Sequence, residues 1–273
     1  MSRIKTTLWY VVLGFGALTM IMPLLWMLST ALKTPGDVYN FPPKWIPNPA
    51  VWTNFTDAWH AAPFGRFFLN SMLVSTCVTI GQLITSSMAA FAFARLRFPG
   101  RDVLFFGYLA TMMVPGSVTL IPAFIIIRYL GWVDTYWALI VPGIFSAYGT
   151  FMLRQFLMGI PRELEEASMI DGCGHLRIFL FVVIPLSKPA LATLSTFTFI
   201  GSWGNFMWPL IVTSSIEKKT LPIGLMIFHN GYAAEWTLMM AASLIVLIPV
   251  ILLYIFNQRF FVESVKMSGM GGA

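Results

Sequence analysis

Few side chains in this 273-residue sequence are of the types that perform catalysis or bind metals. The two cysteines, Cys77 and Cys173, are far apart and form no ligand pattern, and we expect no disulfide between them. None of the three histidines stands in a constellation with a serine, a cysteine or paired carboxylates. The sequence also lacks the Gly-x-x-x-x-Gly-Lys-Ser/Thr loop that cradles phosphates. We therefore expect a chain that is not an enzyme and holds no metal or cofactor of its own.

One polar, acidic stretch, residues 161–185, interrupts an otherwise apolar chain. Pro161 suits the first turn of a helix, where its missing N–H costs nothing. The glutamates at 163, 165 and 166 complement the positive end of that helix. Gly172 ends the helix, because glycine accepts the left-handed conformation of a C-terminal cap, and a second short helix follows over 175–183. The pattern predicts a helix–turn–helix hairpin that can transmit force if a partner grips it; the alternative is a solvated loop with ordinary caps.

The composition indicates that most of the chain lies in a membrane. It is 58% hydrophobic and 10% charged, with a mean hydropathy of +0.77, whereas soluble domains carry about 25% charged residues. The net charge of +6 does not indicate a nucleic-acid partner, because the basic residues lie between apolar runs rather than in a stripe. Six segments without Asp, Glu, Lys or Arg are long enough to span a bilayer as helices: 9–31, 67–94, 103–127, 135–153, 189–213 and 236–257.

These segments contain prolines but no ionisable side chain. We expect Pro115, Pro122 and Pro142 to be tolerated inside the third and fourth helices, because neighbours in a bundle satisfy the freed carbonyls. A carrier driven by protons or sodium ions usually has a buried carboxylate or a broken-helix ion site. Since the segments have no carboxylate, we expect that any energy this protein uses arrives from elsewhere.

The basic residues favour an orientation with both termini in the cytoplasm. In that orientation the inner segments hold 11 Lys and Arg and the outer segments hold 6. The hairpin then faces the cytoplasm, and a Pro- and Trp-rich loop over 33–66 faces outward. In this loop Trp52, Phe55 and Trp59 share one face of a short helix. They either anchor the loop at the membrane interface or touch an external partner.

The acidic stretch resembles the Glu-Ala-Ala signature of bacterial ABC importer permeases. The matching residues stand at the signature's spacing, with serine, valine and isoleucine in place of alanine, isoleucine and leucine: Glu166-Ala167-Ser168, Gly172, Val182 and Ile184-Pro185. Residues 160–172, 202–210 and 258–269 extend the likeness, which covers nearly the whole chain, to the carbohydrate-uptake (MalG-like) branch of the family.

The resemblance implies an all-α membrane protein with six transmembrane helices, the type I ABC importer permease fold, and a cytoplasmic coupling hairpin between spans 4 and 5. The implied organisation is an N-terminal helix with an external loop over 1–66, a permease core over 67–260 and a cytoplasmic tail over 261–273. The implied location is the bacterial cytoplasmic (inner) membrane.

The implied partners are a second, homologous permease, two cytoplasmic ATPase subunits that bind ATP and Mg, an extracytoplasmic solute-binding protein, membrane lipid and a carbohydrate substrate. ATP binding would close the ATPase dimer, pull the hairpins together and switch the membrane helices from inward-facing to outward-facing.

For coupling to the ATPase, the resemblance implies Glu166, Ala167, Ser168, Asp171 and Gly172. Ala167 and Gly172 would allow close approach of the ATPase, and Glu166 would pair with a basic group on it. Alternatively, Glu166 is only an acid at a helix start and Gly172 only a cap.

For the substrate pathway, the resemblance implies Ser202, Trp203, Asn205 and Trp208. An aromatic face can stack on a sugar ring while amide and hydroxyl groups bond its hydroxyls. Alternatively, Trp208 is an interfacial anchor and Asn205 forms an interhelical hydrogen bond, and the partner permease supplies most sugar contacts. We expect packing or interhelical bonds from the polar residues of the second segment, Ser75, Thr76, Thr79 and Gln82.

Three other functions remain open at this point. An ABC permease for glycerol phosphate would be expected to line its path with Arg or Lys, and the segments hold none, although a partner could supply them; a polyamine is another candidate solute. A secondary transporter would work without an ATPase, and the absence of carboxylates in the segments counts against it. A structural membrane scaffold would not need a hairpin of this spacing.

Overall fold

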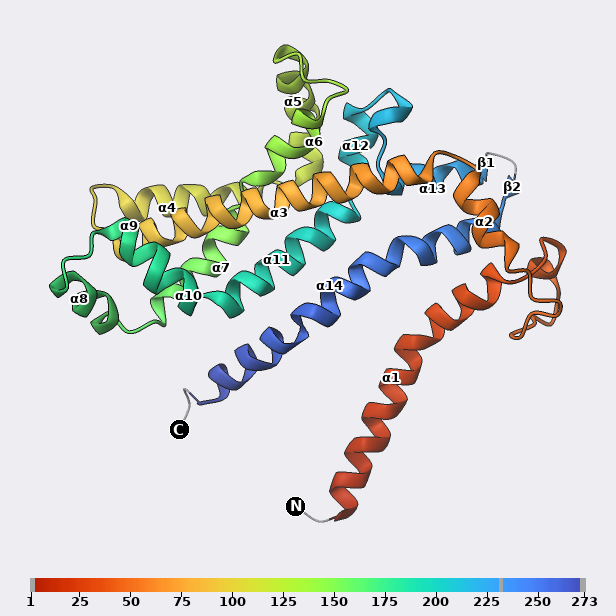
Figure 1. Cartoon of the computed structure of the whole chain (residues 1–273), viewed down its shortest axis with the longest axis horizontal. Coiled ribbons are helices and arrows are strands. Elements are labelled where there is room, and N and C mark those ends of the chain that lie inside the picture. The colour runs from red at the N-terminus through yellow and green to blue at the C-terminus, as the bar shows by residue number, and fades with distance from the viewer. Residues whose placement is uncertain (1–2, 231–232, 271–273) are drawn as a thin grey trace. The chain divides into compact units, whose positions relative to one another are not determined.

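The computed structural model describes residues 3–230 and 233–270 (Figure 1). Most of these residues are helical, and the strands β1 (His229–Asn230) and β2 (Ala233–Ala234) form one short antiparallel pair. The chain divides into two compact units, residues 1–66 with 223–249 and residues 67–222 with 250–273. The α-helices are α1 (Arg3–Ala31), α2 (Thr53–His60), α3 (Phe64–Arg95), α4 (Arg101–Ala110), α5 (Gly116–Tyr129), α6 (Tyr136–Ile140), α7 (Ala147–Met158), α8 (Glu163–Ile170), α9 (His175–Ile178), α10 (Ile184–Leu186), α11 (Lys188–Trp203), α12 (Met207–Val212), α13 (Leu221–Leu225) and α14 (Trp236–Met270).

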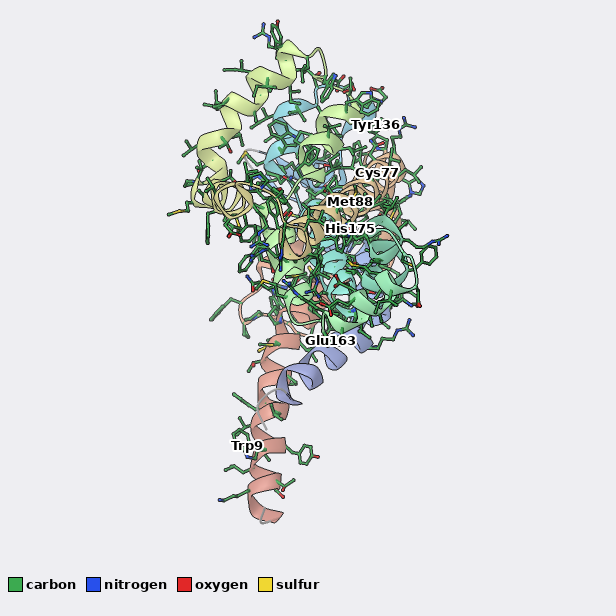
Figure 2. All side chains as sticks on the ribbon, turned by 90° about the vertical axis from the view of Figure 1, so that its left-hand side faces the viewer. Trp9, Cys77, Met88, Tyr136, Glu163 and His175 are labelled. Carbon is green, nitrogen blue, oxygen red and sulfur yellow. The ribbon has the colours of Figure 1, made fainter. Side chains whose placement is uncertain are left out.

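In the first unit, most apolar side chains of α1 are exposed. No residue in the most apolar stretch of α1 is buried, and the side chain of Trp9 points away from the helix axis in Figure 2. After α1 the outer loop folds back, and the amide of Asn54 in α2 donates to the carbonyls of Ala31 at 2.8 Å and Lys33 at 2.9 Å. Trp52 and Phe55 stack on each other at the start of α2, with ring centroids 6.4 Å apart. The short helix expected in this loop is therefore present.

The core of the second unit consists of two hydrophobic clusters along α3. Close packing there depends on small residues, because a Cβ added at Gly149 of α7 would lie 2.7 Å from the Ser86 hydroxyl oxygen of α3. One cluster joins α3 to α7, α9 and α11, and the other joins α3 to α5, α6 and α12. The buried members are Ala90, Phe91, Ala94, Leu153, Leu157, Ile178, Phe179, Val183, Ala190 and Leu194 in the first, and Val74, Val78, Ile127, Ala138, Leu139 and Val212 in the second.

Four described helical stretches are long and apolar enough to cross a membrane, and up to six spans result if each of two bent pairs is counted as one. The four stretches contain the expected segments 9–31, 67–94, 135–153 and 236–257. In the third of them Pro142 lies in a 3₁₀ turn that connects α6 to α7. The other two expected segments are not single straight helices.

The expected segment 103–127 breaks at Pro115. Helix α4 continues through a 3₁₀ turn, and α5 begins after a bend of 102°. Proline disfavours the helical conformation of the residue before it, and Val114 is accordingly extended, with φ −85° and ψ 117°. The expectation that Pro115 lies within a continuous helix is therefore wrong, whereas Pro122 is indeed inside α5.

The expected segment 189–213 divides into α11 and α12. Gly204 caps α11, and three residues without helical structure precede α12. At its other end α11 meets α9 and α10 with a bend of 78° beside Ser187, and a π-helical turn at Phe179–Val183 lies between α9 and α10. The break at 204–206 lies beside residues that line a cavity.

Candidate functional site

A cavity of about 620 Å³ opens among α3, α5, α11, α12 and the 3₁₀ turn after α6. Its wall combines apolar and aromatic side chains with hydroxyl and amide groups, and none of its described lining residues is charged. Sites for small polar ligands commonly have this mixture of apolar walls and a few polar groups. The lining residues are Val78, Gln82, Gly116, Thr119, Leu120, Ala123, Leu139, Pro142, Gly143, Phe197, Thr198, Gly201, Ser202, Asn205, Met207 and Trp208.

Three of the four residues predicted for the substrate pathway meet at this cavity: Ser202, Asn205 and Trp208. The indole Nε1 of Trp208 donates to the carbonyl of Ala138 at 2.8 Å. This bond occupies the only donor of the indole and fixes the ring, so that what Trp208 offers a ligand is its aromatic surface. The backbone N–H of Trp208 also donates, at a long 3.4 Å, to Oδ1 of Asn205, which leaves the amide NH₂ group out of that bond.

The fourth predicted pathway residue, Trp203, lies in the core and not in the cavity wall. Its ring is 3% exposed, stacks on Phe199 with centroids 5.5 Å apart and meets Phe68 edge-on at 5.6 Å. Trp203 thus ties α11 to α3, and the structure separates it from the three residues with which the sequence grouped it.

The helical path is interrupted between α11 and α12, next to residues that line the cavity. Helix α11 ends where the N–H of Gly204 bonds the carbonyl of Ile200 at 3.0 Å. Residues 204–206 have no helical structure, and Pro209 lies in the first turn of α12, where a missing N–H is harmless. Asn205 lies three residues after Ser202, a spacing that places side chains on the same face of a helix, and both residues line the cavity.

Sequence reasoning missed three polar residues of the cavity wall, Gln82, Thr119 and Thr198. Gln82 was expected to make a packing or interhelical bond, but its side chain reaches the cavity from α3. Thr198 has a buried hydroxyl without a described hydrogen-bond partner. A signal was present in the sequence, since Thr198, Ser202 and Asn205 recur at intervals of three and four residues.

The predicted hairpin is present, with the predicted cap. Gly172 has a left-handed backbone, with φ 81°. Its N–H bonds the carbonyl of Met169 at 3.0 Å, and the N–H of Cys173 bonds that of Ser168 at 3.0 Å, which is the pair of bonds that defines a Schellman cap. Helix α9 then begins at His175, as expected.

The residues predicted for coupling gather at the tip of the hairpin. Glu166, Ala167, Asp171 and Gly172 are exposed, while Ser168 is half-buried and its hydroxyl bonds its own helix. Ile170 is 88% exposed. Helix α8 lies past the end of α3 in Figure 1, so within its unit the tip is free to meet another protein.

The root of the hairpin is tied to α3 by a buried ion pair. Nε of Arg95 lies 2.7 Å from Oε1 of Glu165, and the two side chains are only 5% and 8% exposed. The N–H is not directed at that oxygen, so the contact is an ion pair and not a well-formed hydrogen bond. Another nitrogen of Arg95 donates to the carbonyl of Ile160 at 2.8 Å. Glu165 lies in the first turn of α8, as expected, and it also forms this buried ion pair.

Hydrogen bonds to Asp134 hold the loop before α6 against the loop after α12. Its Oδ1 accepts hydrogen bonds from the N–H of Ser214 at 3.0 Å, the N–H of Ser215 at 3.0 Å and the hydroxyl of Ser215 at 2.9 Å. Burial by itself raises the pKa of the Asp134 carboxyl, but these bonds and the charge of Lys218 outweigh burial and hold the pKa below its ordinary value. These hydrogen bonds keep the end of α12, and with it Trp208, in place.

Comparison with known proteins gives a consistent result. The family described as "Binding-protein-dependent transport system inner membrane component" matches residues 82–266. The chain is 36% identical over 263 residues to the sn-glycerol-3-phosphate transport system permease protein UgpE of Yersinia enterocolitica, covering 93% of this chain and 94% of the relative. It is 33% identical over 272 residues to the arabinooligosaccharides transport system permease protein AraQ of Halalkalibacterium halodurans, covering 97% and 96%.

Solved structures agree with the sequence relatives. A chain of a bacterial ABC transporter involved in the import of the acidic polysaccharide alginate matches with a TM-score of 0.83 and 25% identity, covering 96% of this chain and 99% of that one. A chain from the alginate transporter in complex with an alginate pentasaccharide-bound periplasmic protein matches with a TM-score of 0.64 and 12% identity, covering 93% and 90%. The second match shows the fold alone.

Proposed function

This chain belongs to the binding-protein-dependent transport system inner membrane components, and we propose that it carries an uncharged carbohydrate through the cavity between α3, α5, α11 and α12. As a member of that family it is a permease component of an ABC importer and a multi-pass protein of the inner membrane. We propose, in addition, which solute the chain carries, which partners it binds, how it is oriented in the membrane and how it is coupled to ATP hydrolysis.

The cavity wall is the observation that carries the choice of solute. Its described groups are hydroxyls, amides and the aromatic surfaces of Trp208 and Phe197, without an Arg or Lys. Hydroxyl-rich rings match such a wall, because aromatic faces stack on sugars and neutral polar groups bond their hydroxyls. In a site without a cation, neutral hydroxyls and amides replace only part of the hydration that an anion loses. Glycerol 3-phosphate, the solute in the names of several relatives, is therefore the second candidate and not the first.

The hairpin is the proposed docking point for a cytoplasmic ATPase subunit. Ala167 and Gly172 let another backbone come close, Glu166 and Asp171 offer charge to basic groups, and Ile170 offers an exposed apolar anchor. The proposed partners are those the family resemblance implies: a homologous permease, two ATPase subunits that bind ATP and Mg, and a solute-binding protein outside. Both termini and the hairpin then lie in the cytoplasm, in keeping with the distribution of Lys and Arg.

The buried ion pair explains how force at the hairpin would reach the cavity. Glu165 belongs to α8, and Arg95 is the last residue of α3. The same helix α3 contributes Val78 and Gln82 to the cavity wall. Since a helix is stiff along its axis, a displacement of α8 that moves Glu165 also moves a helix that lines the cavity.

The test is uptake by the complete transporter, this chain with its partner permease, ATPase and binding protein, in proteoliposomes loaded with ATP. Radiolabelled neutral oligosaccharides and glycerol 3-phosphate are offered separately. ATP-dependent uptake of an oligosaccharide, unaffected by excess glycerol 3-phosphate, supports the proposal. Uptake of glycerol 3-phosphate but not of an oligosaccharide would show that glycerol 3-phosphate is the solute. Accumulation of solute without ATP would contradict coupling to an ATPase.

A further inference from the structure

A second cavity, of about 490 Å³, lies beside the root of the hairpin and is rich in arginine. Its arginines are Arg95 at the end of α3, Arg101 at the start of α4, Arg154 in α7 and Arg162 just before α8. Glu163 is the only carboxylate among the described lining residues. Four arginines from four segments therefore line one hollow, with one carboxylate among its described lining residues.

Two of the four arginines are neutralised, and two are not. Arg95 is paired with Glu165, and Arg101 lies 2.9 Å from the carboxylate of Asp102. Within the described part of the chain, neither Arg154 nor Arg162 has an acidic group within 4.0 Å.

Two contacts fix the guanidinium group of Arg154 beside the cavity. Its Nε donates to the carbonyl of Phe93 at 3.3 Å, and its guanidinium lies 4.1 Å above the ring of Phe105. The stacked ring orients the guanidinium plane without removing its charge, so the group remains available to an anion.

We propose that this cavity binds the phosphate group of an anionic phospholipid. Guanidinium groups recognise phosphate by paired, charge-assisted hydrogen bonds. The cavity lies where α3 and α7 end and α4 begins, at the ends of membrane-crossing helices, which is the depth of lipid headgroups. Its apolar wall, Ala94, Met158 and Ile160, suits the glycerol and first methylenes of a lipid.

The neighbouring surface extends the positive charge. A hollow of about 500 Å³ shares Arg101 and adds Arg97 and Phe98 of the α3–α4 connection. The hollow also includes Asp102, which pairs with Arg101, so Arg97 is the basic group that it adds near a headgroup in the first cavity. Free phosphate has the same recognition chemistry, so the experiment needs an arm for each source.

The test measures lipid binding to the detergent-purified complete transporter by native mass spectrometry. Phosphatidylglycerol and phosphatidylcholine with identical acyl chains are added in parallel, with and without millimolar inorganic phosphate. The variants are Arg162→Gln and Arg154→Gln, and Arg177→Gln is the matched control because Arg177 is exposed on α9 and does not line the cavity. Because Arg162 is exposed on the surface, Arg162→Gln keeps the test valid if Arg154→Gln disturbs the packing on Phe105.

Preferential binding of phosphatidylglycerol supports the proposal if each Gln variant weakens it about fivefold, the effect of about 1 kcal/mol for one arginine, and Arg177→Gln does not. Displacement by inorganic phosphate identifies a site that also accepts free phosphate; resistance to displacement identifies a lipid site. Equal binding of the two lipids, or unchanged binding in both variants, overturns the proposal. The result does not depend on which solute is carried, so it stands or fails separately from the proposed function.

Discussion

In the cavity between α3, α5, α11 and α12, polarity comes from neutral amides and hydroxyls, whereas at the root of the hairpin it comes from full charges. Gln82 and Asn205 can exchange hydrogen bonds with a passing solute at little cost. Arg95 and Glu165 are held against each other out of water, where a change of partner costs several kcal/mol. The difference indicates weak, replaceable contacts where a solute moves and strong, fixed contacts where force is passed on.

The largest effect is expected at the fixed contact. Glu165→Gln leaves the buried Arg95 without its counter-charge, which costs about 3–5 kcal/mol for a buried pair. We expect a lower Tm for the purified transporter and loss of uptake. The exchanged pair, Arg95→Glu with Glu165→Arg, is the control and should recover part of the Tm. A Glu165→Gln protein with the Tm and uptake of the unchanged chain would contradict the role of the pair.

A change at the hairpin tip should separate ATP hydrolysis from transport. Gly172→Asp places a negative charge on the exposed turn, and nothing lies within 4 Å of the position of its Cβ inside this chain. We expect the complex to assemble and hydrolyse ATP while uptake falls about tenfold or more, in line with a coupling energy of 1–3 kcal/mol.

Gly172→Asn is the matched control for that variant, because asparagine tolerates the left-handed backbone and carries no charge. Uptake close to normal in Gly172→Asn and strongly reduced in Gly172→Asp would assign the effect to charge at the docking surface. Normal transport in Gly172→Asp would count against coupling through this turn.

A smaller effect is expected in the cavity. Asn205→Leu removes an amide that can bond a sugar hydroxyl, a contact worth about 0.5–1.5 kcal/mol. The rate of uptake at low solute concentration should fall about threefold to tenfold, with the amount of assembled complex unchanged. Met207→Leu, an apolar exchange in the same wall, serves as the control. Equal uptake by the two variants would place Asn205 among packing residues.

The smallest effect is expected at Asp134. Asp134→Asn removes the charge but keeps an acceptor, so Tm at neutral pH should fall by only a few degrees. Since the folded-state pKa of Asp134 is lowered, its stabilisation is complete above the ordinary value of about 3.9 and is lost as pH falls below it. The Tm difference between the variant and the unchanged protein should therefore shrink with acidification.

Helix caps and helix breaks can be predicted from the sequence where their cause lies within a few residues. The cap at Gly172 follows from the backbone freedom of one glycine, and the second hairpin helix follows from its neighbours. The break at Pro115 was readable in principle, because the residue before a proline avoids the helical conformation. Apolar composition alone, however, predicts that residues 103–127 form one continuous span.

The sequence by itself determined the apolar, helix-forming character of the chain, the capped hairpin that interrupts it, and the motifs that it shares with importer permeases. Only the tertiary structure decided that Trp203 is a core residue while Gln82 faces the cavity, that Glu165 and not Glu166 pairs with Arg95, and that four arginines share a hollow. Caps and helix breaks depend on backbone sterics within one turn. Cavities and ion pairs depend on which faces of distant helices meet, and one sequence without its fold does not specify those meetings.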